Sequence, residues 1–586
     1  MQSRIFWATF GFISIIFHLA LIFSGLIPNL VSRPLHMALA LPWAFIFLSR
    51  TPIERYSGYL FAIAGLASTI WVAYNADLLG DQYGFISESY QLWIAAVLLL
   101  SVLEMARRCI GWPLPLVAAI ALCYGLFGQY IPGEFGYPGI PLGSFLGTLT
   151  IAEGGIWGKL TGVSVSIVAI FVIFGSVLNA GEAGQGFMNL ALTAAGRLKG
   201  GAAKVSVISS ALFGSISGSA SANVASTGAI TLPAMTKLGY PKSLAGATEA
   251  VASSGGQIMP PLMGAGAFVM VELTGIPYQS IMLAAILPAT LYFWAVWVGI
   301  DAYALRYDLQ GIAEDQQPTR RQLLITCCFF LIPFSILLWG MFGPSFTPQF
   351  SASIAILAAA LLLVFNAKGI AKKEQIYERI ESVSTNAGKQ IAMIAAIILC
   401  ASIVIGVLSI TGLGVKITSL IISGSAGMLW PAILLTAIAC LILGMEVPTT
   451  AAYVICISVA GPALAQLGLS ALQAHLFVFW FALLSTITPP VCGCVFIAAG
   501  MVKENWLKVA ASAMMLGVGL YLIPLAMVAN PSLINLSTTP ILAILNALKI
   551  AIALYFISMS LIAPFSIKKR ALYLVTGTVL IFVISW

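Results

Sequence analysis

The sequence predicts an all-α polytopic membrane protein, and its composition, its apolar runs and an internal repeat support this fold class. Hydrophobic residues make up 60% of the 586 residues and charged residues only 8%, whereas a soluble domain carries about 25% charged residues. Apolar runs long enough to cross a bilayer, which takes roughly 20 residues, recur along the whole chain. By this length criterion we expect about 15 transmembrane helices in the lipid bilayer, together with two re-entrant hairpins.

The first apolar run, residues 5–27, occupies the position of a signal peptide. It is long and no small-residue cleavage motif follows it, so we expect it to be retained as the first span. The net charge of +8 comes from Lys and Arg residues that lie mostly in short loops. Such residues report membrane orientation rather than a nucleic-acid partner, and Arg4 predicts a cytoplasmic N-terminus.

Two stretches of the chain repeat the same pattern of Pro and Gly at a constant offset. The first stretch carries Pro233, Leu238-Gly239 and Pro260-Pro261, and the second carries Pro462, Leu467-Gly468 and Pro489-Pro490 with identical spacing. The offset from Pro233 to Pro462 also carries residues 164–180 onto 393–409 and residues 277–300 onto 506–529. Five expected spans separate the starts of the two copies, and an odd number inverts the second copy. Inverted repeats around broken helices are typical of secondary transporters, whose binding site lies between the repeats.

These patterns divide the chain into four parts. Residues 1–110 hold four spans that match neither copy, and residues 111–160 supply a connecting helix and an outside loop rich in Gly and Pro. Residues 161–530 form the large transport domain, with repeats at about 164–300 and 393–529, and residues 531–586 add two C-terminal helices. The charged stretch 368–390 is expected to be an amphipathic surface helix on the cytoplasmic side.

The first expected hairpin, residues 214–233, is rich in small polar residues although apolar segments flank it. Its tip carries Ser215, Ser217, Ser219, Ser221, Asn223, Ser226 and Thr227. Irregular backbone persists at membrane depth only where it is buried in protein or lines a watery cavity. Unwound carbonyls and hydroxyls can coordinate Na⁺, and helix N-termini favour an anionic solute. The alternative is close packing of small residues between helices.

Three further segments have the same character. The stretch SSGGQIMPP, residues 253–261, breaks the next span, where proline removes a donor and Gln257 offers both a donor and an acceptor. The second copy supplies LGMEVPTTAAYV, residues 443–454, and STITPP, residues 485–490. One broken helix indicates only a kink, whereas four breaks in two related pairs indicate two ion sites with a substrate between them.

Two carboxylates require separate interpretation. Glu446 lies in the second hairpin tip, and an acid within the membrane is a functional hypothesis by default. It either binds a cation or a proton, or lies at the watery mouth of the tip without a specific role. Glu249, like Lys242, is expected at the cytoplasmic interface.

Two other classes of function fit the sequence less well. A redox subunit would need paired haem ligands or a cysteine cluster, whereas His18, His36 and His475 are scattered and the nine cysteines form no CxxC pair. An ion channel usually repeats its filter around the pore axis, whereas an inverted pair suits alternating access. ATP hydrolysis is not expected, since no GxxxxGK[ST] loop occurs.

From about Ile110 onward the chain resembles the permeases of tripartite ATP-independent periplasmic (TRAP) transporters, specifically the fused permeases served by TAXI-type binding proteins. The matching motifs, in order, are IGWPLP, ALFGSISGSASANVASTGAITLPAM, GYPKSLAGATEAVASSGGQIMPPLMGAGAF, GIPY, GMEVPTTAAYV and AHLFVFWFALLSTITPP. The resemblance implies a Na⁺-coupled elevator carrier in the bacterial inner membrane, not an enzyme, that accepts an organic acid from a periplasmic binding protein. Residues 1–110 would resemble the family's small membrane subunit. A proton-coupled or binding-protein-independent carrier remains the alternative.

The resemblance also implies site residues. The first Na⁺ site falls on Ser217, Ser219, Asn223, Gly255, Gly256, Gln257 and Pro260. The second falls on Gly444, Thr449, Thr450, Ser485, Thr488 and Pro489. Substrate contacts are expected from Ser219, Ser221, Asn223, Thr227, Thr449 and Thr450. Glu446 departs from the family pattern, which has a small or apolar residue there, and this leaves the coupling stoichiometry open.

Overall fold

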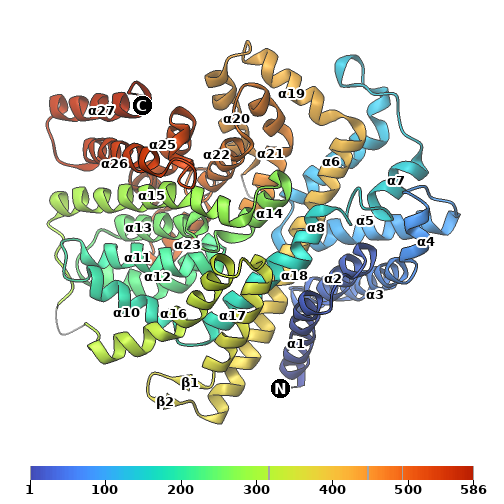
Figure 1. The fold of residues 1–586 in the computed structure, drawn as a ribbon, viewed down its shortest axis with the longest axis horizontal. Coiled ribbons are helices and arrows are strands. Elements are labelled where there is room, and N and C mark those ends of the chain that lie inside the picture. The colour runs from blue at the N-terminus through green and yellow to red at the C-terminus, as the bar shows by residue number, and fades with distance from the viewer. Residues whose placement is uncertain (1, 314–316, 445–447, 491, 585–586) are drawn as a thin grey trace.

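The computed structural model describes residues 2–313, 317–444, 448–490 and 492–584, and these ranges are largely helical (Figure 1). Their one sheet is an antiparallel pair of two-residue strands, β1 (Phe365–Asn366) and β2 (Gly369–Ile370). The predicted all-α fold class is confirmed.

The helices of the first third of the chain include the N-terminal helices on the right of Figure 1. They are α1 (Gln2–Phe23), α2 (Asn29–Pro42), α3 (Pro52–Tyr74), α4 (Ala76–Asp81), α5 (Ser89–Ile110), α6 (Pro113–Phe127), α7 (Leu142–Thr150), α8 (Lys159–Val163) and α9 (Ala169–Ala180). Short helical turns η1 (Trp43–Phe47), η2 (Gly128–Tyr130), η3 (Gly133–Phe135) and η4 (Ser164–Val168) join some of them.

The middle of the chain forms helices at the left and near the centre of Figure 1. They are α10 (Ala183–Ala195), α11 (Gly201–Ser217), α12 (Ala220–Lys237), α13 (Lys242–Gly255), η5 (Gly256–Ile258), α14 (Gly264–Thr274), α15 (Tyr278–Tyr307), α16 (Arg320–Phe342) and α17 (Pro348–Leu362).

The last part of the chain begins with the longest helix and ends with α26, which packs on α15, and α27, which packs on α26. Its elements are α18 (Lys373–Thr411), α19 (Leu413–Gly424), α20 (Leu429–Leu443), α21 (Thr449–Gln466), α22 (Ala471–Leu484), α23 (Gly493–Val502), α24 (Trp506–Leu516), α25 (Val518–Ala529), η7 (Pro531–Ile534), α26 (Pro540–Ile562) and α27 (Ile567–Phe582).

Within the described residues, 12 helices are long and apolar enough to cross a membrane, judged by length and composition. The sequence count of about 15 exceeds this number because several apolar runs form shorter helices. Pro348–Leu362 and Leu429–Leu443 have 15 residues each, and Ala471–Leu484 has 14. At about 1.5 Å per residue, such helices fall short of the roughly 30 Å hydrocarbon core.

Helix α18 is the central element, because it contacts α1, α2, α5 and α6 as well as α9 and α21. In Figure 1 it runs between the N-terminal helices and the helices on the left. At Gly388 of α18 a Cβ atom would lie 2.4 Å from the Trp43 ring of η1. Only glycine therefore lets α18 and η1 pack this closely. The N-terminal helices are therefore fitted tightly to α18.

Corresponding helices of the two related stretches begin at residues that are separated by the offset found in the sequence. Helices α12 and α21 begin at Ala220 and Thr449, which are separated by the same offset as Pro233 and Pro462. Helices α13 and α22 begin at Lys242 and Ala471, and α14 and α23 begin at Gly264 and Gly493, with the same separation. The chain therefore breaks at equivalent places in the two stretches.

Two of the histidines that look scattered in the sequence are neighbours in the structure. His18 of α1 and His36 of α2 are fully buried, and their Nε2 and Nδ1 atoms lie 2.8 Å apart. The outer ring nitrogens contact the Ser14 carbonyl oxygen at 2.7 Å and the Ser164 hydroxyl at 3.0 Å. All four ring nitrogens are thus engaged in hydrogen bonds. The histidine pair therefore gives no support to a redox subunit with paired haem ligands.

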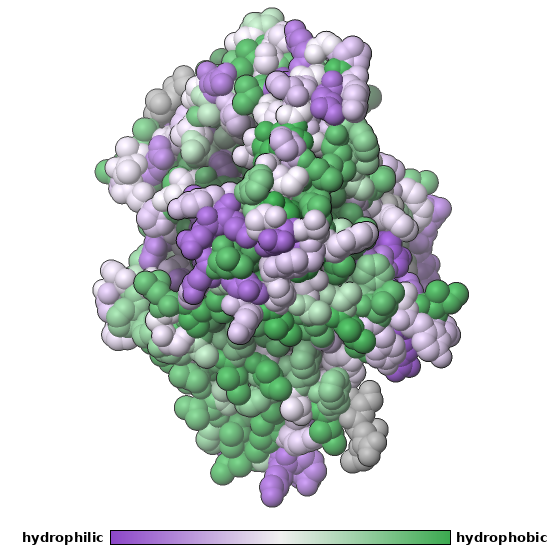
Figure 2. All heavy atoms as spheres, turned by 90° about the vertical axis from the view of Figure 1, so that its right-hand side faces the viewer, coloured by the Kyte–Doolittle hydropathy of each residue, from purple (hydrophilic) through white to green (hydrophobic). Residues whose placement is uncertain are grey.

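The surface also has the character of a membrane protein. Figure 2 shows broad hydrophobic areas on the side that lies at the right of Figure 1, with hydrophilic residues gathered in clusters. Exposed large apolar side chains on α3 include Ile53, Leu60, Ile63 and Ile70. A soluble monomer rarely exposes contiguous apolar surface on this scale.

Candidate functional site

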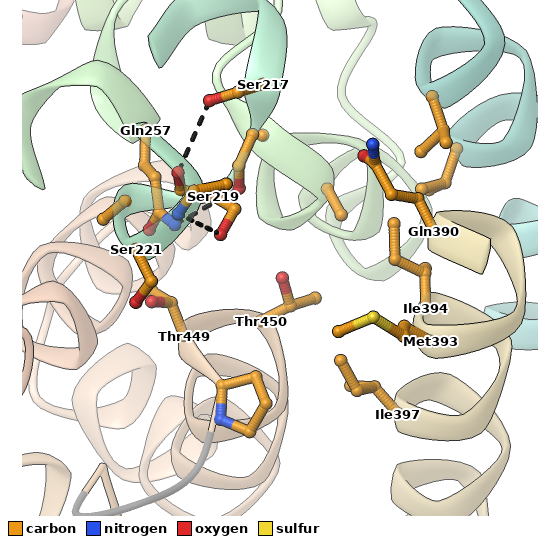
Figure 3. A pocket seen from close by; sticks show the side chains of 18 of the residues that line it. Ser217, Ser219, Ser221, Gln257, Gln390, Met393, Ile394, Ile397, Thr449 and Thr450 are labelled. Atoms are coloured by element: carbon orange, nitrogen blue, oxygen red, sulfur yellow. Dashed lines mark hydrogen bonds between the residues drawn. The ribbon is translucent and has the colours of Figure 1, made fainter. Parts of the chain in front are cut away.

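A cavity of about 640 Å³ lies between the α11–α12 turn, the N-terminus of α21 and helix α18 (Figure 3). Its polar lining includes Ser217, Ser219, Ser221, Gln257, Thr449, Thr450, Ser485 and Thr486 on one side and Asn386, Lys389 and Gln390 of α18 on the other. Apolar walls come from Phe171, Ile216, Phe268, Met393, Ile394 and Ile397. In Figure 3 the serines and threonines lie across the open space from Gln390, Met393, Ile394 and Ile397.

The first tip is built by a glycine turn and a serine cap. Gly218 ends α11 with a φ of +62°, a left-handed conformation that favours glycine. The Ser219 hydroxyl accepts a hydrogen bond from the Ala222 backbone N–H at 3.3 Å and so caps α12. Because residues 219–222 line the cavity, the positive end of the α12 dipole lies at its wall.

Two glycines let α11 and η5 touch backbone to backbone. A Cβ atom on Gly214 would lie 2.4 Å from the Gly256 Cα atom and 2.7 Å from the Asn223 side-chain nitrogen. This approach places Gln257 beside the tip, where its Nε2 donates to the Gly218 carbonyl oxygen at 3.2 Å. The predicted break at residues 253–261 thus meets the predicted hairpin tip.

The donor set at the first tip suits a hard cation such as Na⁺. The Gln257 Oε1 atom is buried and has no hydrogen-bond partner among the residues that the structure describes. Hydroxyl oxygens of Ser217 and Ser219 lie on the same cavity wall. Among the described residues no cluster of three His, Cys, Asp or Glu side chains could hold a metal ion, but Na⁺ can be coordinated by uncharged carbonyl and hydroxyl oxygens.

The second tip presents a similar surface. Helix α21 begins at Thr449 after Pro448, and Pro448, Thr449 and Thr450 all line the cavity together with Gly444. The Ser485 hydroxyl donates to the Ala482 carbonyl oxygen at 2.8 Å. Glu446 lies outside the described residues, so the structure does not place it.

The structure brings most of the predicted site residues to one cavity, although four segments, two from each related stretch, supply them. Those that line it are Ser217, Ser219, Ser221, Gln257, Gly444, Thr449, Thr450 and Ser485. The others, Asn223, Thr227, Gly255, Gly256, Pro260, Thr488 and Pro489, lie behind this wall and do not line the cavity.

Buried partners account for several of the residues behind the wall. Asn223 is fully buried and donates through Nδ2 to the Ser210 carbonyl oxygen at 2.8 Å. The Thr488 hydroxyl lies 2.7 Å from the Tyr521 hydroxyl. At Gly255 a Cβ atom would lie 2.2 Å from the Tyr292 ring. These residues shape the wall from behind.

The expected interfacial position of Glu249 is wrong. Its side chain is fully buried among α11, α12 and α13, and five hydroxyl groups contact its carboxylate. The sequence analysis grouped Glu249 with Lys242, whose side chain is exposed. The Ser and Thr residues that surround it come from three helices, and only their packing brings them together.

Sequence reasoning also missed the α18 wall of the cavity. The charged stretch expected as a separate surface helix is the N-terminal part of α18, which continues without a break to Thr411. Asn386, Lys389 and Gln390 at the end of that stretch line the cavity. The available signal was the polar sequence NAGKQ, which directly precedes a strongly apolar run.

Comparison with known proteins agrees with this architecture. Residues 97–542 match the family model described as the tripartite ATP-independent periplasmic transporter, DctM component. An uncharacterized protein of Sinorhizobium fredii is 23% identical over 420 residues, which cover 70% of this chain and 92% of the relative.

Two relatives carry functional names. The ectoine/5-hydroxyectoine TRAP transporter large permease of Ruegeria pomeroyi is 24% identical over 413 residues, 66% of this chain and 92% of the relative. The C4-dicarboxylate TRAP transporter large permease of Pseudomonas aeruginosa is 23% identical over 324 residues, 55% of this chain and 74% of the relative. Since the family model spans more than half of the sequence, this multi-pass membrane protein belongs to the DctM component family of tripartite ATP-independent periplasmic transporters.

Proposed function

We propose that the protein is a Na⁺-coupled carrier for an organic acid that a TAXI-type periplasmic binding protein delivers. Its family is one of transporter permeases, not of enzymes. The observation that carries the proposal is the cavity between two hydroxyl-rich helix N-termini and α18, in which one side chain of the described lining, Lys389, bears a formal charge.

Lys389 favours an anionic solute. Its side chain is half-buried in the cavity wall and has no ion-pair or hydrogen-bond partner among the described residues. A desolvated ammonium without a counter-ion is costly, and a bound carboxylate would offset that cost through a charge-assisted hydrogen bond. The named relatives transport C4-dicarboxylates and ectoine, and both solutes carry a carboxylate.

Na⁺ is the proposed driving ion because the two tips offer oxygen ligands and no basic groups. The unpartnered Gln257 Oε1 and the Ser217 and Ser219 oxygens would hold one ion, and oxygens near Gly444, Thr449, Thr450 and Ser485 would hold the other. Each Na⁺ that moves inward contributes about 2.3 kcal/mol per 100 mV of membrane potential. Two ions would therefore support strong accumulation of the acid.

An elevator motion fits the composition of the cavity wall. One side of the cavity is formed by the tips of α12 and α21. The other side is formed by α18, against which the N-terminal helices pack. We propose that the tips form re-entrant hairpins of an inverted repeat and move as a unit past α18. Residues 1–96 precede the matched region, and we assign residues 1–110 to a fused small subunit with a cytoplasmic N-terminus, in the inner membrane.

Ion selectivity tests the Na⁺ sites without knowledge of the solute. Na⁺ should raise the melting temperature of the purified protein, whereas K⁺ at the same concentration should not, because a ligand at ten times its Kd stabilises by about 1.4 kcal/mol. Equal effects of the two ions would contradict Na⁺ binding.

Uptake by proteoliposomes tests the transport proposal, with labelled succinate and ectoine as probes. Uptake should require a Na⁺ gradient and the binding protein. Lys389→Gln should raise KM about tenfold or more, since a charge-assisted hydrogen bond contributes about 1.5–3 kcal/mol. Lys373→Gln, an exposed position at the start of the same helix, is the control and should leave KM unchanged. Rapid, gradient-independent ion conduction would indicate a channel instead.

A further inference from the structure

Glu249 lies at the centre of a ring of hydroxyl groups. Ser206 donates to Oε2 at 2.7 Å, and Ser210 and Ser253 donate to Oε1 at 3.2 Å each. Thr227 also donates to Oε1 and Thr231 to Oε2. The donors come from α11, α12 and α13, and every member of the ring is at most 4% exposed.

No cation balances this carboxylate among the described residues. The buried titratable side chains on the surrounding helices are Cys494 of α23 and Tyr278, Tyr292 and Tyr303 of α15, together with Lys204, which is paired with Asp301 at 2.6 Å. None of them forms a hydrogen bond or ion pair with Glu249, and Lys237, Lys242 and Lys508 on these helices are exposed. Burial without a cation favours the neutral acid, whereas five hydroxyl donors favour the carboxylate.

The ring accepts either protonation state without moving a heavy atom. Thr227 Oγ1 lies 2.8 Å from the Asn223 carbonyl oxygen, and Thr231 Oγ1 lies 3.1 Å from the Thr227 carbonyl oxygen. Each threonine therefore has a second acceptor for its single hydroxyl hydrogen. When a proton from water bonds to Oε1, the new O–H donates to Thr227 Oγ1, whose own hydrogen turns to the Asn223 carbonyl. Oε2 and Thr231 can do the same, and no covalent bond within the protein breaks.

The ring has space for a proton but not for a metal ion. Na⁺ would have to separate the carboxylate from its neighbours, but hydroxyl oxygens already contact both carboxylate oxygens. The hydroxyl of the neighbouring Ser254 lies 2.7 Å from the Thr486 hydroxyl, and Thr486 lines the cavity.

The helix pair does not need the ring in order to pack. At the equivalent positions of the second stretch, Val478 stands in place of Glu249, and Cys456, Ala460 and Ala482 stand in place of Thr227, Thr231 and Ser253. All four are buried, and α21 and α22 have the same bounds relative to the offset as α12 and α13. The acid and its hydroxyls are therefore an addition to the fold.

We propose that Glu249 is a proton-binding site of the carrier, which takes up and releases a proton in the physiological pH range. The hydroxyl ring transmits this change through Thr227 to Asn223 behind the first tip. As a second coupling ion this proton rests on the proposed transport function, but proton binding itself can be measured without transport.

Infrared difference spectroscopy of the full-length protein in lipid vesicles, recorded in buffer alone between about pH 5 and about pH 9, tests the site. The wild type should show a protonated carboxylic-acid band that disappears as the pH rises, and Glu249→Gln should lack that band. Glu504→Gln, which removes a loop carboxylate paired with Lys508, should retain it.

A second variant keeps the test decisive if Glu249→Gln does not fold. Thr231→Val retains the acid but removes one donor to its ionised form, so the band should persist to a pH about one unit higher. The proposal is overturned if the wild type shows no such band, if the band does not change with pH, or if Thr231→Val leaves its midpoint in place. None of these outcomes depends on Na⁺-driven uptake of the acid.

Discussion

The two helical units that face the cavity, α11–α13 and α20–α22, share the bounds of their second and third helices but differ in what they bury. In the first unit α12 and α13 enclose a carboxylate and its hydroxyl donors, whereas in the second unit the same positions of α21 and α22 hold Val, Cys and Ala. The close backbone approach also differs. Gly214 meets Gly256 in the first unit, whereas in the second Gly444 meets Ser485, whose Cβ atom would lie 3.1 Å from a Cβ atom on Gly444.

This difference distinguishes the residues that the fold requires from the residues that it does not require. Both units turn at the same place in their sequences and present hydroxyls to the same cavity. The buried acid with its hydroxyl ring belongs to the first unit, at positions where the second unit shows that apolar residues suffice. A buried acid is expensive wherever apolar packing would serve, so a function is the better explanation for it.

The largest expected effect comes from placing an acid in the second unit. Val478→Glu buries a carboxylate at the position equivalent to Glu249, among Cys456, Ala460 and Ala482, which offer no hydroxyl donors. We expect the free energy of unfolding in mixed micelles to fall by about 3–5 kcal/mol, because the charge is uncompensated. Val478→Thr, similar in shape, is the control. A loss below about 1 kcal/mol for Val478→Glu would show that the second unit tolerates an acid as well as the first does.

An intermediate effect is expected at the backbone contact. In Gly256→Ala the new Cβ would lie 2.5 Å from the Gly214 Cα atom, so the α11–η5 contact must open, at a cost of about 1–3 kcal/mol. The matched change in the second unit is Ser485→Ala, which removes one hydrogen bond to the Ala482 carbonyl and should cost about 1 kcal/mol or less. Thermal unfolding of both variants measures the difference, and equal losses would contradict the tighter packing of the first unit.

The smallest effect compares single hydroxyls on the first helix of each unit. Ser206→Ala removes a donor to Glu249 and should lower stability by about 1–2 kcal/mol. The Thr436 hydroxyl on α20 is buried and has no hydrogen-bond partner in the described part of the chain, so Thr436→Val should be neutral or slightly stabilising. If the two variants have the same melting temperature, the ring around Glu249 contributes nothing to stability.

Much of the site was accessible from sequence because the relevant signals are local. Gly218 and Ser219 mark the first turn, and the paired prolines mark where each following helix breaks. Constant spacing then relates the two copies, since a helix of fixed rise needs the same number of residues to reach the same place. The sequence could not show that Asn223 and Thr227 support the cavity wall from behind and do not line it. Their position depends on how far α12 is rotated against α11 and α13.

The sequence by itself determined that this chain is a helical membrane protein with two related, hydroxyl-rich breaks, because composition and residue spacing act along the chain. Only the tertiary structure decided that Lys389 of a distant helix faces both breaks, that His18 lies against His36, and that Glu249 sits inside a ring from three helices. The physical reason is that a side chain's environment depends on neighbours that packing brings from elsewhere in the chain. The environment of an acid such as Glu249 therefore becomes known only when the helices around it are placed.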